Sequence, residues 1–131
     1  MAKYVYPAIF TQEDNKSYSV FFPDLEGCYT CGDDLNDAIM MAEDVLAFVL
    51  YDYEAGNKEI PAPSKMEDIT LTGKEFVNYI ACNTLEYAKR HNNKAVKKTL
   101  TIPAWLNDEA EAHDINFSGV LQAALKKQLK L

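Results

Sequence analysis

The stretch that decides the fold is KKTLTIPAWLNDEAEAHDINFSGVLQAALKKQLKL, residues 97–131. Near its start Leu100 and Ile102 alternate with Thr99 and Thr101, which is the two-residue period of a strand with one buried face. Pro103 would end that strand, and proline is tolerated in the first turn of a helix that follows. The stretch therefore predicts a strand over Lys97–Ile102, followed by a helix over residues 107–114.

A second helix is predicted from Asn116 to the end of the chain. Asparagine is a favourable N-cap, and the residues after it repeat with helical spacing. One face of this helix gathers Leu121, Ala124, Leu125 and Leu129. A unit this small has too little core to fold alone, so it is expected to dimerise. The expected dimer core consists of Leu100, Ile102, Leu121 and Leu125.

Two such strands side by side form a two-stranded ribbon, which fits the DNA major groove. The segment resembles a ribbon-helix-helix DNA-binding domain. In that family the strand face that points away from the core reads bases, which here implies Lys97, Thr99 and Thr101. Threonine can exchange a hydrogen bond or touch a thymine methyl, and lysine prefers guanine. The alternative is an ordinary solvated edge strand.

The start of the last helix is a candidate phosphate contact. Asn116, Phe117, Ser118 and Gly119 would leave backbone N–H groups free in the first turn, and such helix ends bind phosphate. Gly119 would also let the backbone approach closely. The alternative is a plain capped helix.

Charge is divided unevenly along the chain. Residues 1–93 hold 7 basic and 16 acidic side chains, a formal charge of −9, whereas residues 94–131 hold 6 lysines and 4 acids, a charge of +2. An acidic body would repel DNA, so only the tail is a plausible nucleic-acid contact. The body is better suited to a basic partner.

The body reads as a mixture of strands and helices. The expected strands span residues 3–11, 17–22, 29–32 and 76–82, and a short helix is expected over 83–90. A long helix is expected from an Asp34 cap to about Ala55, with Gly56 as its stop. The fold class is thus α+β. The expected domains are 1–90, a hinge at 91–95, and the ribbon-helix-helix unit at 96–131.

The body also carries a family pattern. FPDLEGC at 22–28, T-x-G-D at 30–33, L-x-x-A at 35–38, AE at 42–43 and IPAPS at 60–64 resemble the N-terminal domain of HicB-type antitoxins. The resemblance implies a partial ribonuclease-H-like fold without activity, built as a three-stranded sheet, a long helix and a further strand. It implies a type II toxin–antitoxin pair. The antitoxin neutralises a small basic HicA-type ribonuclease, an mRNA interferase, and represses the shared operon by binding operator DNA.

Clustered carboxylates in the body allow more than one interpretation. A ribonuclease-H-like fold could use them to bind magnesium, but Asp34 is explained as a cap and Asp37 as a partner of the helix dipole. A surface for a basic toxin is favoured, with Asp24 and Glu26 as the candidate charged contacts. A merely solvated acidic face is the alternative.

No metal site and no cofactor are expected. Three cysteines do not suggest a disulfide framework and fit a reducing cytoplasm, and the Cys28-x-x-Cys31 pair lacks two further zinc ligands. His91 and His113 lie in no recognisable nucleophile or acid–base arrangement. No signal peptide and no apolar run of membrane length is found, so a cytoplasmic location is expected.

Two rival functions remain open. A ligand-sensing repressor would share the DNA-binding tail and add a buried polar pocket or a bound metal in the body. An enzyme would need a clustered acid–base site, which the residues do not suggest.

Overall fold

The computed structural model describes all 131 residues and divides into two compact units, Met1–Lys94 and Ala95–Leu131. They are called the body and the tail below, and each is described by itself. No helix in either unit combines the length and the apolar character that a membrane crossing needs.

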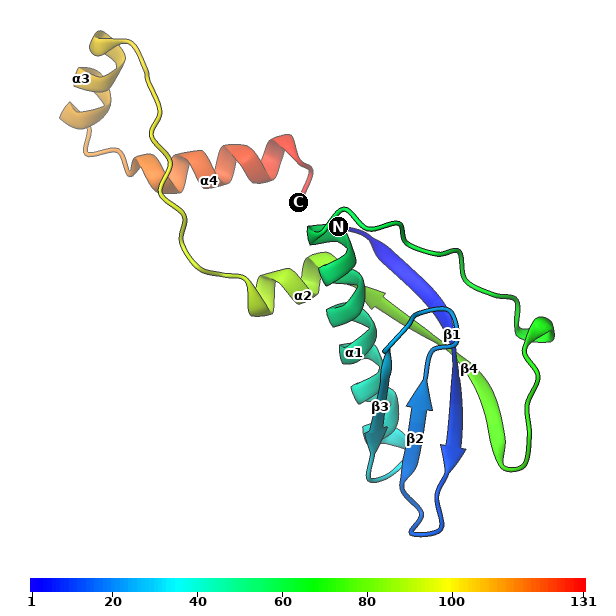
Figure 1. Ribbon diagram of the computed structural model, residues 1–131. Helices are drawn as coiled ribbons and strands as arrows, with labels where there is room; N and C mark the ends of the chain where they lie inside the picture. Colours follow the sequence, from blue (N-terminus) through cyan, green and yellow to red (C-terminus); the bar gives the residue numbers. More distant parts are fainter. The chain divides into compact units, whose positions relative to one another are not determined.

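The body contains one antiparallel sheet (Figure 1). Its strands are β1 (Lys3–Gln12), β2 (Tyr18–Phe21), β3 (Tyr29–Gly32) and β4 (Glu75–Asn83), in the order β3-β2-β1-β4. The expected three-stranded sheet and further strand are both present, and together they form one four-stranded sheet. β4 joins the same sheet and pairs with β1 from Lys3↔Asn83 to Thr11↔Glu75. This pairing links segments about seventy residues apart, which local patterns cannot reveal.

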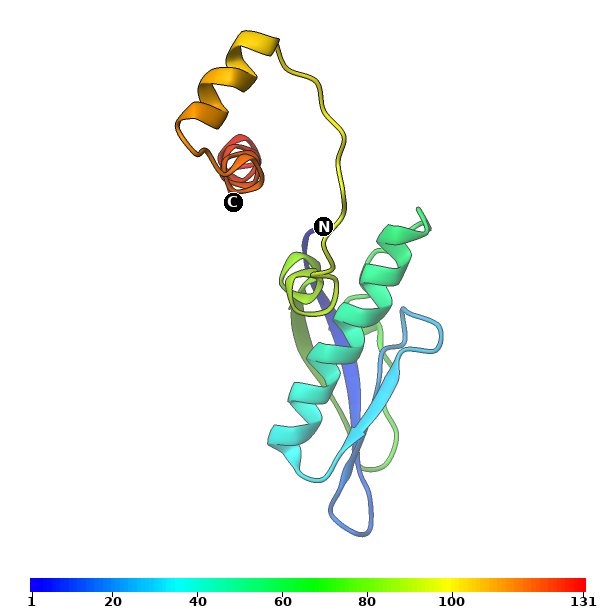
Figure 2. The same cartoon turned by 90° about the vertical axis from the view of Figure 1, so that its left-hand side faces the viewer.

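The long helix α1 (Leu35–Ala55) lies on one side of the sheet (Figures 1 and 2). Its predicted cap is confirmed, since the Asp34 carboxylate accepts the N–H of Asp37 at 2.8 Å. Gly56 closes the other end as expected. The core between helix and sheet includes Tyr6, Ala8, Phe10, Val20, Phe22, Ile80, Ala38, Ala42, Leu46 and Leu50. Every second residue of β1 enters this core, as the two-residue period of a strand requires.

Gly32, at the end of β3, lies where the sheet meets α1. A Cβ atom built on Gly32 would lie 2.3 Å from the backbone nitrogen of Ala38 and 2.5 Å from its Cα. No side chain fits there, so glycine is required by the close approach of the two backbones.

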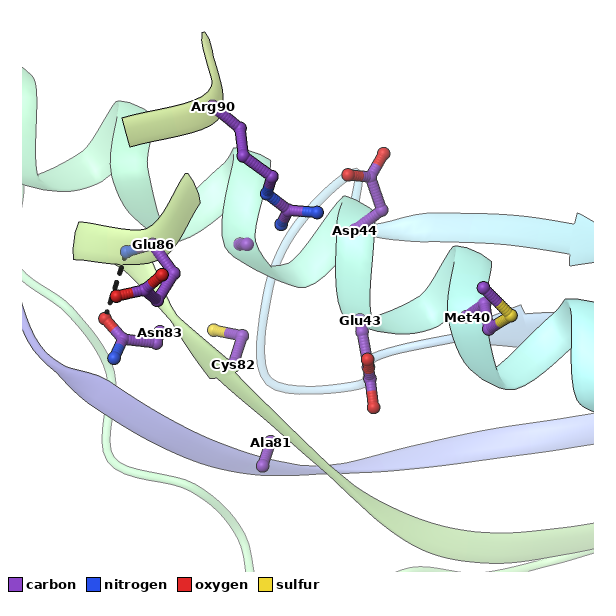
Figure 3. Close-up of a pocket in the computed structure, with 9 residues that line it drawn as sticks. Met40, Glu43, Asp44, Ala81, Cys82, Asn83, Glu86 and Arg90 are labelled. Atoms are coloured by element: carbon purple, nitrogen blue, oxygen red, sulfur yellow. Dashed lines mark hydrogen bonds between the residues drawn. The ribbon is translucent and has the colours of Figure 1, made fainter. Parts of the chain in front are cut away.

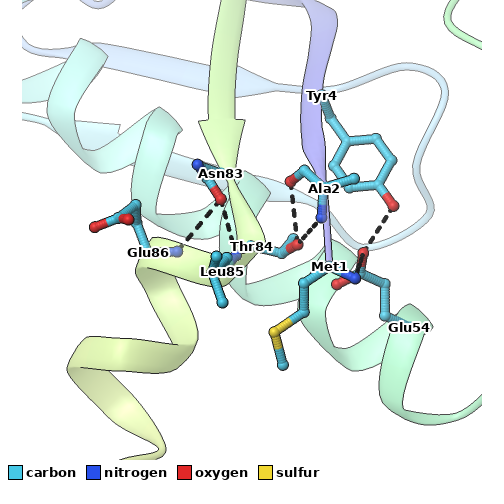
Figure 4. Close-up of polar contacts among 8 residues, drawn as sticks. All are labelled: Met1, Ala2, Tyr4, Glu54, Asn83, Thr84, Leu85 and Glu86. Atoms are coloured by element: carbon cyan, nitrogen blue, oxygen red, sulfur yellow. Dashed lines mark hydrogen bonds and ion pairs between the residues drawn. The ribbon is translucent and has the colours of Figure 1, made fainter. Parts of the chain in front are cut away.

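The short helix α2 (Thr84–His91) begins where β4 ends. The Asn83 side chain caps it by accepting the N–H groups of Leu85 at 2.9 Å and Glu86 at 3.3 Å (Figure 4). The buried Thr84 hydroxyl accepts the N–H of Ala2 at 2.8 Å and donates to the Ala2 carbonyl at 3.1 Å. These bonds tie the start of α2 to the residue before β1 and so fix where the chain leaves the sheet after β4.

Glu54, near the end of α1, is held in the same region. Its carboxylate lies 3.4 Å from the amino group of Met1 and accepts the Tyr4 hydroxyl at 2.9 Å (Figure 4). Burial, together with the Glu54 carboxylate, raises the pKa of Tyr4 to about 12. Tyr4 therefore remains a neutral hydrogen-bond donor at physiological pH.

The connector from α1 to β4 contains one short 3-10 helix, η1 (Met66–Asp68). Earlier in the connector, the Pro61 carbonyl accepts the Tyr6 hydroxyl. Ile60 packs against the core. The connector is thus attached to the body at its first half.

The tail contains two helices, α3 (Ala104–Ala112) and α4 (Phe117–Gln128). α3 begins earlier than predicted, because Pro103 takes the N-cap position instead of a place inside the first turn. α4 begins as predicted after Asn116. Its end falls at Gln128, three residues short of the predicted one.

The strand predicted at Lys97–Ile102 is not formed in the single chain, so its pairing with a second copy stays a prediction. A strand exists only when its N–H and C=O groups pair with a neighbour, and the tail offers no second strand. None of residues 95–131 is buried. The tail therefore has helices but no closed hydrophobic core of its own.

Candidate functional site: an open apolar groove in the tail and an acidic cleft in the body

An apolar groove of about 780 Å³ runs through the tail. Its apolar lining consists of Leu100, Ile102, Leu106, Ala110, Ile115, Phe117, Val120, Leu121 and Ala124. Three of the four predicted dimer-core residues are in this set. Leu125 is not among the lining residues, and half of its surface is exposed. Helices α3 and α4 thus direct a continuous apolar surface toward the extended residues 97–102. This surface remains open.

The extended segment keeps the alternation seen in its sequence. All six residues are exposed, but Lys98, Leu100 and Ile102 line the groove, whereas Lys97, Thr99 and Thr101 do not. The two sets therefore lie on different faces of the extended segment, as alternate residues of a β-strand do. The base contacts of Lys97, Thr99 and Thr101 stay a prediction.

The start of α4 differs from expectation at one residue. The Asn116 side chain accepts the N–H of Gly119 at 3.1 Å, so Gly119 has no free donor. The N–H groups of Phe117 and Ser118 remain without a partner in the chain. The N–H group of Asn116 is likewise without a partner, so any phosphate contact at this helix end would come from these three donors and not from Gly119.

In the body, the two candidate toxin contacts prove unequal. Asp24 is half-buried and accepts hydrogen bonds from the N–H of Ser64, at 2.9 Å, and from its hydroxyl. It anchors the connector to the loop between β2 and β3. Asp24 is therefore not the free surface charge that the sequence led us to expect. Glu26 is exposed and makes no hydrogen bond or ion pair. Sequence reasoning missed the role of Asp24 because Ser64 lies forty residues away.

A second feature of the body is a cleft of about 190 Å³ between α1, β4 and α2 (Figure 3). Glu43 and Asp44 come from α1, Glu86 and Arg90 from α2, and Cys82 from β4. Burial, with added contributions from Glu54 and Glu43, raises the pKa of Cys82 to about 11. This thiol is therefore protonated at physiological pH and is a poor nucleophile or metal ligand. Sequence reasoning missed the cleft because three separate elements build it.

The remaining cysteines and histidines have structural surroundings. Cys28 is buried in the core, where burial raises its pKa to about 12, whereas Cys31 is exposed. His91 stacks on Tyr87 with ring centroids 4.3 Å apart, and His113 Nδ1 lies 2.8 Å from the Glu109 carbonyl oxygen. No group of three potential metal ligands comes together in the chain.

Comparison with known families gives a match over most of the chain. Residues 6–124 match the family described as HicB-like antitoxin of bacterial toxin–antitoxin system. The match spans both the body and most of the tail.

Individual relatives agree with this match. The chain is 28% identical over 102 residues to an uncharacterised 14.9 kDa protein from the rep–hol intergenic region of Haemophilus phage HP1, covering 78% of this chain and 75% of that protein. It is 37% identical over 59 residues to antitoxin HicB 2 of Photorhabdus laumondii, covering 45% of this chain and 42% of that protein.

Solved structures show a similar fold. A chain of the toxin–antitoxin complex from Streptococcus pneumoniae has a TM-score of 0.62 and 26% identity, over 96% of this chain and 99% of that one. The antitoxin HicB of Burkholderia pseudomallei has a TM-score of 0.53 at 16% identity, over 96% of this chain and 98% of that one. At that lower identity the likeness concerns the fold alone.

Proposed function

Because the chain belongs to the HicB-like antitoxins of bacterial toxin–antitoxin systems, a family of antitoxins rather than enzymes, we propose that its body neutralises a HicA-type mRNA-interferase toxin and its tail represses the shared operon. The observation that carries the proposal is the division of the chain. An acidic body with its own core is joined to a basic tail whose apolar groove is open. Relatives of this fold are found in toxin–antitoxin complexes.

The tail is proposed to act as a homodimer. Leu100 is 58% exposed and Ile102 is 47% exposed, although both line the groove. A second tail would supply the strand that residues 97–102 lack and would cover these side chains. The pair of tails would then form the ribbon-helix-helix domain that the sequence resembles. Size measurement of the purified chain by light scattering tests this step, and a strictly monomeric chain would contradict it.

Operator binding is assigned to the ribbon face with Lys97, Thr99 and Thr101. This face stays exposed when the opposite face is covered in the dimer, so its side chains are available to base edges. The free N–H groups of Phe117 and Ser118 would bind backbone phosphates and set the register of the ribbon. The charge of +2 on residues 94–131 favours the approach to DNA, whereas the charge of −9 on residues 1–93 opposes it.

Replacing Lys97, Thr99 and Thr101 by alanine is expected to weaken operator binding and relax its sequence preference. Each good base contact contributes roughly 1–3 kcal/mol of discrimination. The Lys97 change should also lower the salt dependence of binding if that ammonium reaches a phosphate. DNA binding and rescue of toxin-arrested growth are measured on the same variants. Rescue should survive all three changes, and loss of rescue with intact DNA binding would invert the assignment.

Toxin binding is expected to depend on salt through its association rate. Opposite charges speed the encounter of an acidic body with a basic toxin, whereas an apolar centre governs dissociation. Association should therefore slow as salt rises, while dissociation changes less. Glu26→Lys should slow association slightly without unfolding, because Glu26 has no partner in the chain. Asp24→Lys is a poor test, since it would also break the Ser64 contact. Stopped-flow measurements at two salt concentrations check this, and a salt-independent rate would contradict it.

A further inference from the structure

Helix α1 is acidic along its whole length. Its 21 residues include five carboxylates and no lysine, arginine or histidine. Three of the five are engaged within the body. Glu54 binds the Met1 amino group, Asp52 lies 3.9 Å from Lys58, and Asp37 accepts the N–H of Asp33. Glu43 and Asp44 make no ion pair or hydrogen bond, so they are unpaired carboxylates in the middle of the helix.

The same region of α1 exposes large apolar side chains. Met40 is 62% exposed and Phe48 is 56% exposed. Residues four apart lie above one another on a helix, so Met40, Asp44 and Phe48 form one stripe. Met41, 42% exposed, lies beside this stripe. An exposed apolar stripe between unpaired carboxylates is typical of a binding surface rather than of a solvated helix face.

The acidic cleft opens beside this stripe. Met40 and Asp44 belong to both features, and Glu43 beside them also lines the cleft (Figure 3). Arg90 extends over the cleft from α2 without forming an ion pair, and Glu86 is paired with Lys89 at 3.1 Å. The cleft of about 190 Å³ is large enough for one long side chain rather than for a cofactor.

We infer that the exposed stripe of α1, with Met40, Glu43, Asp44 and Phe48, is the surface on which a basic toxin docks, and that the cleft beside it receives one lysine or arginine side chain of that toxin. The inference rests on the proposed antitoxin function and deepens it by naming the surface. Met40 and Phe48 supply the desolvated apolar contact, while Glu43 and Asp44 pair with the incoming cation.

Charge separates this surface from its main rival. The sheet face opposite α1 also exposes apolar side chains, among them Tyr29 at 70% and Tyr79 at 47%. However, the four strands together hold only one basic residue, Lys3, and one acidic residue, Glu75. That face would offer a basic partner no net attraction, whereas α1 offers the two unpaired carboxylates of Glu43 and Asp44.

The first test reverses charge on α1 in the full-length chain. The variant Glu43→Lys/Asp44→Lys is compared with Glu67→Lys/Asp68→Lys, which changes net charge equally at two exposed residues of η1 without partners. The probe is the toxin encoded in the same operon, and association is followed by stopped flow at low salt. We expect the α1 variant to associate about tenfold or more slowly than the η1 variant, because a contact charge acts more strongly than a distant one.

The second test removes the apolar contacts. Met40→Ala should speed dissociation of the toxin about fivefold or more, as expected when a contact residue near the centre of an interface is truncated. Tyr29→Ala on the opposite sheet face is the matched control and should leave dissociation unchanged. Thermal unfolding of each variant verifies that the fold is intact, since both side chains are largely exposed.

The outcomes separate the two levels of the proposal. If the wild-type chain does not bind the toxin at all, the proposed function fails. If it binds but the α1 variants behave like their controls, the antitoxin function stands and the α1 surface is wrong. Loss of binding in Tyr29→Ala alone would place the toxin on the opposite sheet face.

Discussion

A chain that ends at Asn93 is expected to lose specific operator binding and to keep toxin neutralisation. All proposed DNA contacts, and the groove proposed to form the dimer, lie after that residue. Specific protein–DNA binding is typically about 10³-fold or more tighter than non-specific binding, and the whole of that margin should disappear. The acidic body that remains would add only repulsion toward DNA.

The truncated body is expected to fold, because every residue of the hydrophobic core lies between Tyr4 and Cys82. Electrophoretic mobility shifts on operator DNA and rescue of toxin-arrested growth, measured with full and truncated chains, check the prediction. Operator binding by the truncated body at full strength would refute the division of labour between body and tail.

Gly32→Ala is expected to destabilise the body more than any other single methyl group added to it. The new Cβ would lie 2.3 Å from the Ala38 nitrogen and 2.8 Å from the Asp37 carbonyl carbon, both of them backbone atoms. Backbone cannot rotate away as a side chain can, so α1 must move off β3. Overpacking of this kind costs typically about 1–3 kcal/mol and sometimes more, and a backbone clash belongs at or above the upper end.

Chemical unfolding of the full-length chain by urea measures this loss. Cys31→Ala, next to Gly32 but exposed, is the control and should unfold near the wild-type midpoint. An unchanged midpoint for Gly32→Ala would mean that the backbones of α1 and β3 leave room for a Cβ atom at residue 32. Toxin neutralisation should fall together with stability in this variant, because the proposed toxin surface lies on α1.

Several features could be predicted from the sequence because short-range chemistry decides them. The Asp34 cap, the Gly56 stop and the Asn116 cap each involve residues within a few positions of one another. Helix periodicity and the alternation of Lys98, Leu100 and Ile102 are likewise local properties. The motif at 22–28 also led to the correct family, since it is a continuous stretch.

Other features depend on groups that are distant in sequence, and the tertiary structure alone decided them. β4 joined the sheet because its N–H and C=O groups met those of β1, whose paired residues lie 64 to 80 positions earlier. Asp24 became an anchor instead of a free charge because the fold brought Ser64 to it. The acidic cleft exists because α1, β4 and α2 meet at one place.

The tail contains features of both kinds, those decided by local sequence and those decided by distant groups. Its sequence determined which side chains of residues 97–102 face the helices, because alternation in an extended chain depends only on the backbone. Whether those residues become a strand depends on hydrogen-bond partners that a single chain does not contain. The fold positions the apolar side chains that line the open groove. Only a surface from outside the tail can cover them and supply the missing hydrogen-bond partners.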